Sequence, residues 1–347
     1  MAIFAVVATM EENKNLSSFA IWRKPGQQSC RAIFSRPEAL ANVVNLDNRR
    51  GFVFAPFDAM GSLPTLFFHG DAQPFDFPSP DDAPIPDVAD RWQADNGDFE
   101  RNFLAAHEML VAGKLQKVVI ASHEDLDCDI RPCAMPLFRR ACDAYPDAFV
   151  ALVALPNGDI WLMATPELLV SSHGMNLQTM ALAGTLRADE KAWDEKNKRE
   201  HAVVARFVEE RLASKTDCLK IEGPETVKAG ALSHLRTRFR ARMLKGVSAW
   251  DVATALHPTP AMCGMPQDDA RDAILSIESA DREYFSGLAG VISPEGDADI
   301  YVTIRCVKMS PDGARLYSGV GLMPDSDVEA EAAEAAAKRL TIKRLIS

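Results

Sequence analysis

The sequence lacks the features that would place it in several large classes of proteins. It has no excess of basic residues, because the formal net charge is −11 over 347 residues. This argues against a nucleic-acid partner, since phosphate binding requires basic patches. No apolar run approaches the roughly 20 residues needed to cross a bilayer, so no membrane partner is predicted. The N-terminal run MAIFAVVATMEENK has no basic segment and is interpreted as a strand, not a signal peptide.

Paired cysteine motifs are also missing. The seven cysteines contain no CxxC pair, and an odd number without such spacing argues against a disulfide framework or a structural zinc site. Reduced thiols are typical of the cytosol. We therefore predict a cytoplasmic protein.

What remains is the composition of a soluble globular protein, with 47% hydrophobic and 25% charged residues. The length allows one large domain or two small ones. There is no internal repeat. One segment stands out, PFDFPSPDDAPIP from Pro74 to Pro86. Its proline and acid content predicts a loop and excludes a helix or a central strand.

Hydrophobic patterns predict both strands and helices. The segments SFAIWR and GFVFAPF predict strands in the first 70 residues. Helices are predicted from Asp98 to Gly113, from Pro136 to Tyr145 and from Asp189 to Ser214. The segments AFVALVALP, DIWLMAT and ELLVSS are predicted to form an antiparallel meander. The segments YFSGLAGVIS and ADIYVTIRCVKM are predicted to form a hairpin, with Arg305 inside the second strand.

The alanine-rich stretch DSDVEAEAAEAAAK predicts the last helix. Ser326 is the expected N-cap, and Glu329 completes a capping box. Glu331, Glu334 and Lys338 share one face of this helix. They are either a solvated charged face or a hard-cation site beside an anion-binding lysine. The preceding strand and glycine-rich turn, LYSGVGLMPDSD, favour the second interpretation, because a helix N-terminus binds anions.

Four other charged residues have ordinary explanations when taken singly. Lys117 opens the apolar strand LQKVVIAS, where a lysine usually extends its ammonium to water. Glu167 follows a Thr-Pro turn, and Glu200 precedes His201 on the charge-rich helix. Arg305 needs an anionic partner if it points inward, because a buried unpaired charge is costly. The alternative is that Arg305 faces solvent, since polar residues alternate along this predicted strand.

Together, the local segments resemble one family in their order along the chain. They are KVVIAS, TPELLV, MALAGTLR, KNKREH, LHPTPAMCGMP, SIESADREYFSGLAGVIS, YVTIRC, LYSGVG and EAEAAEAAAK. The chain resembles the chorismate-utilising enzymes, and within them isochorismate synthase. The resemblance covers about residues 98–347 and is densest after His257. It does not extend to the first hundred residues.

The resemblance implies an α/β (α+β) fold, a four-layer α-β-β-α sandwich in which two large antiparallel-rich sheets lie between helices. The active site is expected deep inside. A variable N-terminal part, residues 1–97, is expected to pack into the same fold as the chorismate-binding catalytic core, residues 98–347. The resemblance also favours a monomer.

The implied activity is Mg²⁺-dependent conversion of chorismate to isochorismate, by attack of water at C2 and loss of the C4 hydroxyl. Lys117 is implied as the base that activates water, and Glu167 as the acid that protonates the leaving hydroxyl. The resemblance assigns Mg²⁺ to Glu200, Glu334 and, through water, Glu331. The implied substrate contacts are Gly184, Thr185, His257, Arg305, Tyr317, Gly319 and Lys338.

Two positions distinguish the relatives. Lys117 resembles the water-activating lysine of isochorismate and salicylate synthases, which anthranilate and aminodeoxychorismate synthases typically lack. Ala183 stands where aminodeoxychorismate synthases carry a nucleophilic lysine, which disfavours ammonia chemistry. Salicylate synthase, which adds pyruvate elimination, stays an alternative because it uses the same acid and base. Menaquinone biosynthesis is the predicted pathway as the commoner use, with a siderophore pathway as the alternative.

The chain departs from the family pattern at three positions. Ser122 stands where arginine is usual, Ala181 where proline is usual, and Asn197 where aspartate is usual. These departures leave a degenerate ligand-binding relative as the non-enzyme alternative. The acid, base and metal positions are intact and count against it.

Overall fold

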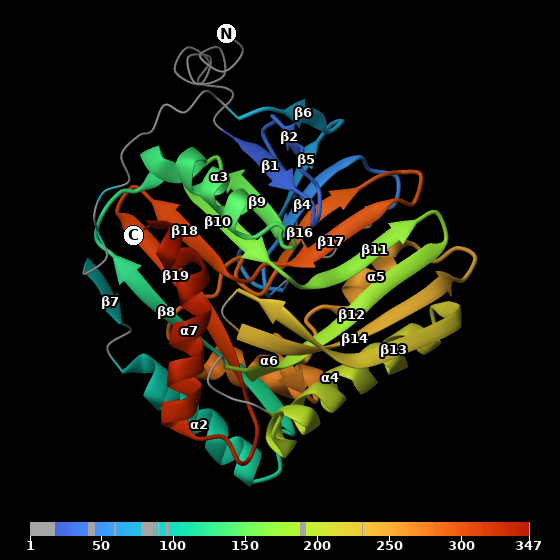
Figure 1. Ribbon diagram of the computed structural model, residues 1–347. Coiled ribbons are helices and arrows are strands. Elements are labelled where there is room, and N and C mark those ends of the chain that lie inside the picture. The colour runs from blue at the N-terminus through green and yellow to red at the C-terminus, as the bar shows by residue number, and fades with distance from the viewer. Residues whose placement is uncertain are drawn as a thin grey trace.

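Two large antiparallel sheets form the centre of the molecule (Figure 1). The computed structural model describes residues 18–40, 46–58, 60–77, 86, 88, 91–94, 97–187, 192–230 and 232–346. The strand predicted at the N-terminus and most of the proline-rich segment lie outside these residues.

The first sheet has ten strands in the order β15-β8-β19-β18-β10-β9-β1-β2-β6, and β7 also pairs with β8. Its pairings are antiparallel. The central strands are almost continuously apolar because both of their faces are covered. The strands are β1 (Phe19–Arg23), β2 (Cys30–Ile33), β6 (Gln73–Phe75), β7 (Trp92–Ala94), β8 (Lys117–Leu126), β9 (Phe149–Ala154), β10 (Ile160–Thr165), β15 (Gly264–Met265), β18 (Cys306–Ser310) and β19 (Gly313–Leu322).

The second sheet has nine strands in the order β13-β14-β12-β11-β17-β16-β4-β5-β3. Its pairings are also antiparallel. The strands are β3 (Glu38–Leu40), β4 (Gly51–Ala55), β5 (Thr65–His69), β11 (Leu168–His173), β12 (Asn176–Leu186), β13 (Thr216–Ala229), β14 (Leu232–Met243), β16 (Leu288–Ile292) and β17 (Ala298–Val302).

Helices cover the outer faces of both sheets. An apolar cluster joins α3 and the end of α7 to the first sheet, and another joins α4 and α5 to the second. A third, rich in aromatic residues such as Trp22 and Trp161, fills the space between the sheets. The predicted four-layer sandwich is therefore confirmed. The helices are α2 (Asp98–Val111), η2 (Arg131–Cys133), α3 (Ala134–Ala144), α4 (Glu195–Ala213), α5 (Ala249–Leu256), α6 (Gln267–Ile277) and α7 (Val328–Ile346).

Strands from the first hundred residues take part in both sheets. In the first sheet β1 pairs with β9, and in the second β4 pairs with β16. β4 is buried along its whole length. Residues on both sides of position 97 thus contribute to the same two sheets.

The predicted meander is wrong at its last step. β9 pairs with β10, but β11 pairs with β12 and β17 in the other sheet. The strand predicted around Arg305 is wrong for a similar reason. β17 ends at Val302 and β18 begins at Cys306 in the other sheet, so Arg305 lies on a crossover and has a φ of 50°. Alternation within a segment does not reveal a change of sheet.

Two predicted helix starts also differ. The N-cap of α7 is Asp327, whose carboxylate accepts a hydrogen bond from the Ala330 N–H at 2.9 Å. Ser326 instead contacts the side chain of Glu331, so the predicted capping box with Glu329 is not formed. α4 starts at Glu195, after the N-cap Asp194, later than the sequence predicted. An aspartate serves both caps because its carboxylate accepts from free N–H groups of the first turn.

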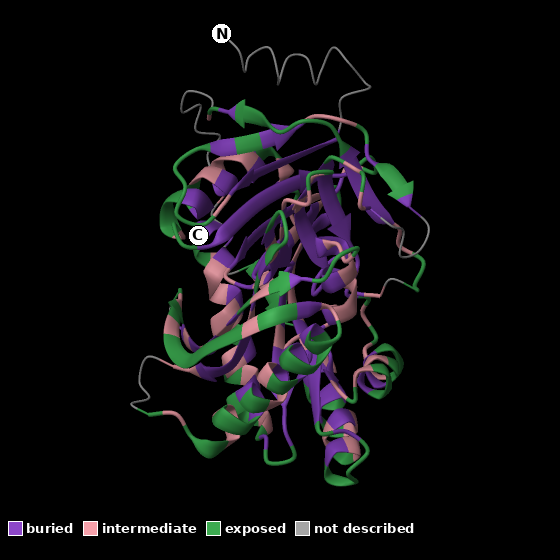
Figure 2. Cartoon of the chain, turned by 90° about the vertical axis from the view of Figure 1, so that its right-hand side faces the viewer, coloured by how far each residue is buried: buried purple, intermediate pink, exposed green. Residues whose placement is uncertain are grey.

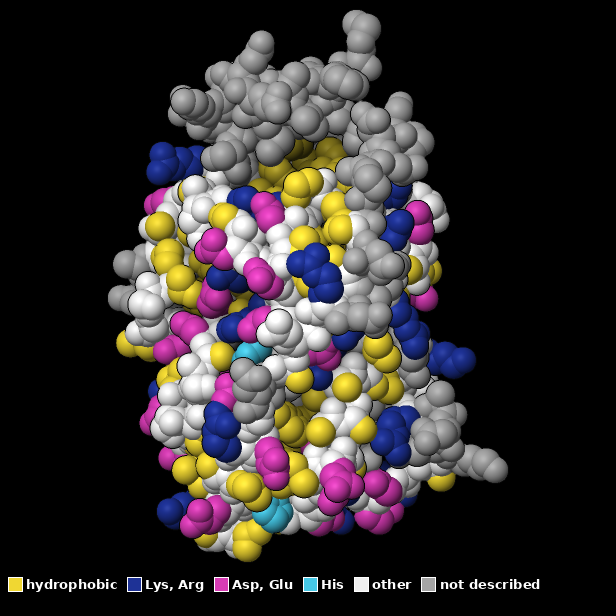
Figure 3. Space-filling view, turned by 90° about the vertical axis from the view of Figure 1, so that its left-hand side faces the viewer, with side chains coloured by type: hydrophobic (Ala, Val, Ile, Leu, Met, Phe, Trp, Pro, Cys, Tyr) yellow, Lys and Arg dark blue, Asp and Glu magenta, His cyan; other side chains and the backbone are white. Residues whose placement is uncertain are grey.

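Buried residues follow the central strands, and exposed residues lie on the outer helices (Figure 2). On the face shown in Figure 3, basic and acidic side chains are interspersed and do not gather in a patch of one sign. Within the described ranges, no helix is both long and apolar enough to span a membrane.

Candidate active site

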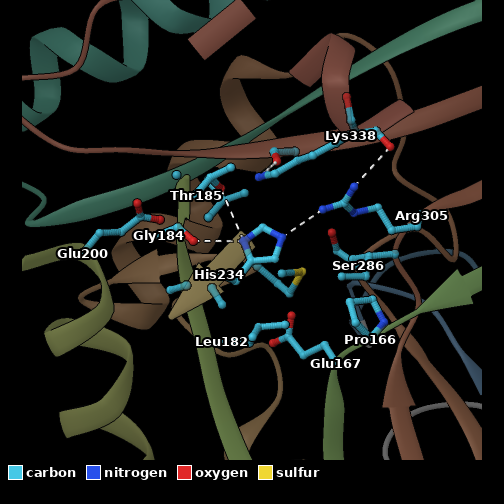
Figure 4. A pocket seen from close by; sticks show the side chains of 18 of the residues that line it. Pro166, Glu167, Leu182, Gly184, Thr185, Glu200, His234, Ser286, Arg305 and Lys338 are labelled. Carbon is cyan, nitrogen blue, oxygen red and sulfur yellow. Dashed lines mark hydrogen bonds between the residues drawn. The ribbon is translucent and has the colours of Figure 1, made fainter. Parts of the chain in front are cut away.

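A cavity of about 60 Å³ lies between the sheets (Figure 4). It is beside the two connections, at Glu167 and at Arg305, where the chain crosses from one sheet to the other. Apolar side chains such as Leu182 and Phe285 form part of its wall. Several ionisable side chains line it, which is unusual for an interior space because such groups are costly to bury without partners. These lining residues are Glu167, Glu200, His234, Arg305 and Lys338.

Lys117 forms an ion pair with Glu200, which lines the cavity, but Lys117 itself is outside the lining. Lys117 is the first residue of β8 and is fully buried. Its Nζ lies 3.0 Å from Glu200 Oε1, without the alignment of a hydrogen bond. Gly321 makes room for the pair, since a Cβ there would lie 2.2 Å from Glu200 Oε1. Lys117 therefore does not extend to solvent, the ordinary alternative that the sequence left open.

Glu167 lies on the two-residue crossover between β10 and β11. Its side chain lines the cavity, and the residue is 3% exposed. The Val302 N–H donates to the Glu167 carbonyl at 3.1 Å, which fixes the crossover against β17. Burial raises the pKa of Glu167 to about 7, against the attraction of Lys117, Lys338 and Arg305. A carboxyl group with this pKa can donate a proton near neutral pH.

His234 was not predicted, and it connects two parts of the site (Figure 4). Its Nδ1 lies 2.9 Å from the Gly184 carbonyl, and its Nε2 lies 3.0 Å from Arg305 Nη2. Burial, together with the charges of Arg305 and Lys338, lowers the pKa of His234 to about 3. The imidazole is therefore neutral. Nδ1–H donates to the carbonyl, and Nε2 accepts from the guanidinium.

Arg305 is buried and faces the cavity. Its Nη1 donates to Thr341 Oγ1 at 3.0 Å and to the Lys338 carbonyl at 3.3 Å, both on α7. Burial lowers the pKa of Arg305 to about 10, against the attraction of Glu334. The guanidinium remains charged at neutral pH and offers an anchor for an anion.

Glu334 is held by two side chains. Thr185 Oγ1 donates to its Oε1 at 2.8 Å, and Lys338 Nζ lies 2.7 Å from the same oxygen. Burial alone would raise the pKa of Glu334, but the attraction and hydrogen bonds of Lys338, with the Thr185 bond, lower it to about 2. Lys338 also donates to the Gly319 carbonyl at 2.8 Å. This face of α7 is not solvated.

The Gly184–Thr185 turn is shaped by a bulge in β12. Gly184 has a φ of 73°, and a Cβ there would lie 3.0 Å from the Asn197 carbonyl. The Thr185 N–H donates to Asn197 Oδ1 at 2.8 Å. The Asn197 N–H in turn donates to the carboxylate of the N-cap Asp194 at 2.7 Å. The asparagine that departs from the family pattern thus joins the start of α4 to the bulge.

Two further networks hold the walls, and neither was predicted. Arg282 donates to the carbonyls of Val119 and Met262, two lining residues, at 2.7 and 2.9 Å. Arg339 donates to the hydroxyls of Ser122 and Ser318 at 2.8 Å each. A guanidinium from α7 therefore lies against Ser122, the position where relatives carry an arginine.

The predicted metal ligands come from α4 and α7, and each is paired with a lysine. Glu200 pairs with Lys117, Glu334 with Lys338, and Glu331 with Lys196. Among the residues that the structure describes, no three His, Cys, Asp or Glu side chains converge closely enough to hold a metal ion. Carboxylate oxygens are nevertheless the donors that Mg²⁺ prefers. The donor chemistry fits this ion.

Glu331 is buried and accepts from Ser326 Oγ at 2.8 Å. Burial and repulsion by Glu334 raise its pKa. Burial would lower the pKa of Lys196, but attraction by Glu331, Glu200 and Glu334 outweighs it, and the pKa is raised. Lys196 thus contacts Glu331 and is attracted by the other two carboxylates.

His257 and Tyr317 are outside the lining of the cavity. The Tyr317 ring stacks on Phe285, which does line it, with centroids 5.3 Å apart. Their assignment as substrate contacts stays a prediction.

Comparison with known proteins places these residues in a family. The sequence model of the family described as "Chorismate binding enzyme" matches residues 75–347. The chain belongs to the chorismate-binding enzyme family. This confirms the predicted resemblance.

Curated relatives of this family member are named isochorismate synthases. EntC of Escherichia coli K12 is 30% identical over 256 residues, which cover 70% of this chain and 66% of EntC. DhbC of Bacillus subtilis is 39% identical over 196 residues, which cover 53% of this chain and 49% of DhbC. The matched region thus spans between half and two thirds of these relatives.

Solved structures extend the likeness over nearly the whole chain. A putative 2,3-dihydroxybenzoate-specific isochorismate synthase, DhbC from Bacillus anthracis, has a TM-score of 0.82 at 26% identity, covering 98% of this chain and 99% of that one. MenF, the menaquinone-specific isochorismate synthase from Escherichia coli, has a TM-score of 0.80 at 21% identity, covering 96% and 91%. The second likeness supports the fold alone.

Proposed function

We propose that this protein is an isochorismate synthase that converts chorismate to isochorismate with Mg²⁺. The observation that carries the proposal is the placement of Lys117 and Glu167 in one buried site, with the pKa of Glu167 near 7. The names of the curated relatives support the same reaction.

In the proposed reaction a water oxygen bonds to C2 of chorismate, and the C4 hydroxyl leaves as both ring double bonds shift, from C1=C2 to C1=C6 and from C5=C6 to C4=C5. Lys117, after its ammonium has given up the proton it holds in the ion pair with Glu200, takes the proton of the attacking water. Glu167, protonated through about pH 7, gives its proton to the departing hydroxyl. One proton is accepted and one is donated, so the protein needs only proton exchange to reset.

The substrate is a dianion, and the cavity supplies cations to bind it. Arg305 is the anchor, because it is charged, buried and fixed through His234 and Thr341. Lys338 and the Gly184–Thr185 bulge complete this side. Glu200, Glu334 and Glu331 would hold Mg²⁺, which neutralises a substrate carboxylate and orients it.

The test is incubation with chorismate and Mg²⁺, with the products separated by chromatography. We expect isochorismate as the main product. Salicylate plus pyruvate as the main product at neutral pH would favour the salicylate synthase alternative. A folded protein that binds chorismate without product would favour a degenerate binding relative. Glu210→Gln, on the exposed side of α4, is a matched control for loss of a carboxylate outside the site.

The pathway needs a separate test, because relatives named for both uses are similar. They include the vibriobactin-specific enzyme of Vibrio cholerae at 33% identity and MenF of Bacillus subtilis at 28%. Complementation of strains that lack either a menaquinone-specific or a siderophore-specific synthase distinguishes the two. The menaquinone assignment fails if growth returns only under iron limitation.

We further propose a cytoplasmic monomer in which residues 1–97 are part of the catalytic fold. The seven free thiols suit a reducing compartment, and the pairing of β1 and β4 with later strands ties the N-terminal part to both sheets. Analytical ultracentrifugation tests the monomer. Removal of residues 1–97 tests the domain assignment, and an active, stable core would contradict it.

A further inference from the structure

Glu200, Glu331 and Glu334, the carboxylates proposed to hold Mg²⁺, are called the carboxylate cluster below. Lys196 has no part in the proposed reaction, yet its ammonium contacts one member of this cluster. It is in the first turn of α4, and it pairs with Glu331 of α7. The side chains of the two residues are 19% and 2% exposed. The bonded Glu331 oxygen, Oε1, also accepts from Ser326. This oxygen of Glu331 therefore already accepts from two protein donors.

The same ammonium is attracted by Glu200 and Glu334. These are the other two carboxylates that the proposed function assigns to the metal. An ammonium and a hard divalent cation seek the same oxygens, and both cannot occupy the closest position to Glu331. The two cations therefore compete.

We propose that Lys196 is the resident counter-ion of this carboxylate cluster, and that it competes with a divalent cation for Glu331, whether the cation binds that carboxylate directly or through water. The proposal rests on the proposed function for the identity of the cluster as the metal site. Lys196 is then a tuning residue for metal affinity, and touches no reacting atom.

The balance of charges gives the direction of the effect. Three glutamates, Glu200, Glu331 and Glu334, face three lysines, Lys117, Lys196 and Lys338, in the pairs described above. A bound dication adds two positive charges to this balanced set, and the two negative charges of a dianionic substrate neutralise them. Loss of Lys196 leaves one more negative charge, which favours the cation and disfavours the anion. Opposite effects on two ligands are a signature that general damage to the site would not produce.

The test measures binding of Mg²⁺ alone to the full chain by calorimetry. Lys196→Met is compared with wild type and with Lys198→Met. Lys198 is a matched control, because it lies two residues further on α4 with a side chain 52% exposed and pairs with Glu195. We expect Lys196→Met to bind Mg²⁺ on the order of tenfold more tightly. Lys198→Met and the charge-preserving Lys196→Arg should stay within about twofold of wild type.

A second measurement guards against a folding defect. Without Mg²⁺, Lys196→Met leaves a buried carboxylate without its partner and should unfold at a lower temperature than wild type. Added Mg²⁺ should compensate for this loss of stability, so the Mg²⁺-dependent rise in melting temperature should be larger for Lys196→Met than for wild type. Equal or weaker Mg²⁺ binding by Lys196→Met, or no larger rise, overturns the proposal. Neither readout uses turnover. A protein that follows both expectations but leaves chorismate unchanged refutes the proposed reaction and not the role of Lys196.

Discussion

Replacing Glu167 with glutamine should stabilise the protein at alkaline pH while it abolishes activity. The side chain is fully buried, and the pKa of its carboxyl is raised from 4.5 to about 7, chiefly by burial. A group with a raised carboxyl pKa prefers to be protonated in the folded state. Once the pH is high enough for the Glu167 carboxyl to ionise in the unfolded chain, folding carries a free-energy penalty. Glutamine is neutral at every pH and does not carry this penalty.

The size and pH range of this penalty follow from the two pKa values. Below about pH 4.5 both states are protonated and the penalty is absent. It grows as pH rises from 4.5 to about 7 and is complete above that. At about 1.4 kcal/mol per pKa unit, the difference is worth roughly 3 kcal/mol. The free energy of unfolding of Glu167→Gln should therefore exceed that of wild type by roughly this amount at pH 9, and by almost nothing at pH 4.5.

Denaturant unfolding of both proteins between pH 4.5 and 9 measures the difference directly. Glu210→Gln serves as the control and should show no such trend, since it lies on the exposed side of α4. Single-turnover assays on the same samples should show a loss of roughly 100- to 10,000-fold, the usual worth of general acid catalysis. A difference in unfolding free energy that is the same at every pH would refute the assignment of a raised pKa.

Three further predictions concern the rest of the site. Lys117→Ala should lower the single-turnover rate by roughly 100- to 10,000-fold and retain chorismate binding by calorimetry; loss of binding with an intact rate would make Lys117 an anion clamp. Arg305→Ala should weaken chorismate binding by at least roughly tenfold, whereas Arg206→Ala, on the exposed side of α4, should not; equal affinities would contradict the anchor role. Gly184→Ala should cost about 1–3 kcal/mol of unfolding free energy from strain and crowding against Asn197. Gly174→Ala, with a φ of 55° but nothing within 4 Å, should cost less, and equal costs would remove the crowding argument.

The local hydrophobic pattern predicted those helices and strands whose formation depends mainly on their own residues. The helices α2 and α3 and the strands β1 and β4 follow from their own apolar pattern. Lys117, Glu167 and Arg305 were identified through family resemblance, because each has an ordinary surface explanation on its own strand. Their burial arises from packing between residues far apart in the chain, which no single segment encodes.

The residues that sequence reasoning missed depend on such distant partners. His234 lies in LSHLRTRFRARM, where alternating arginines are typical of an exposed strand, and its role is set by Gly184 and Arg305. The alternation gave no signal for a site residue, since it puts His234 on the same face of the strand as the four arginines. Gly321 belongs to the SGVG segment, which is part of β19, and its requirement for glycine comes from Glu200 on α4.

The two crossovers have a consequence for insertions and deletions. Glu167 lies in a connection of two residues between β10 and β11, and Arg305 in one of three between β17 and β18. Neither connection has spare length, so one added residue would either displace the side chain or shift a whole strand by one position and exchange its two faces. The turns at Asn157 and at Pro294–Glu295, at the other ends of these strands, are exposed. Natural length variation and engineered domain insertions should therefore accumulate at those outer turns, while the crossovers keep a constant length across proteins that retain the reaction.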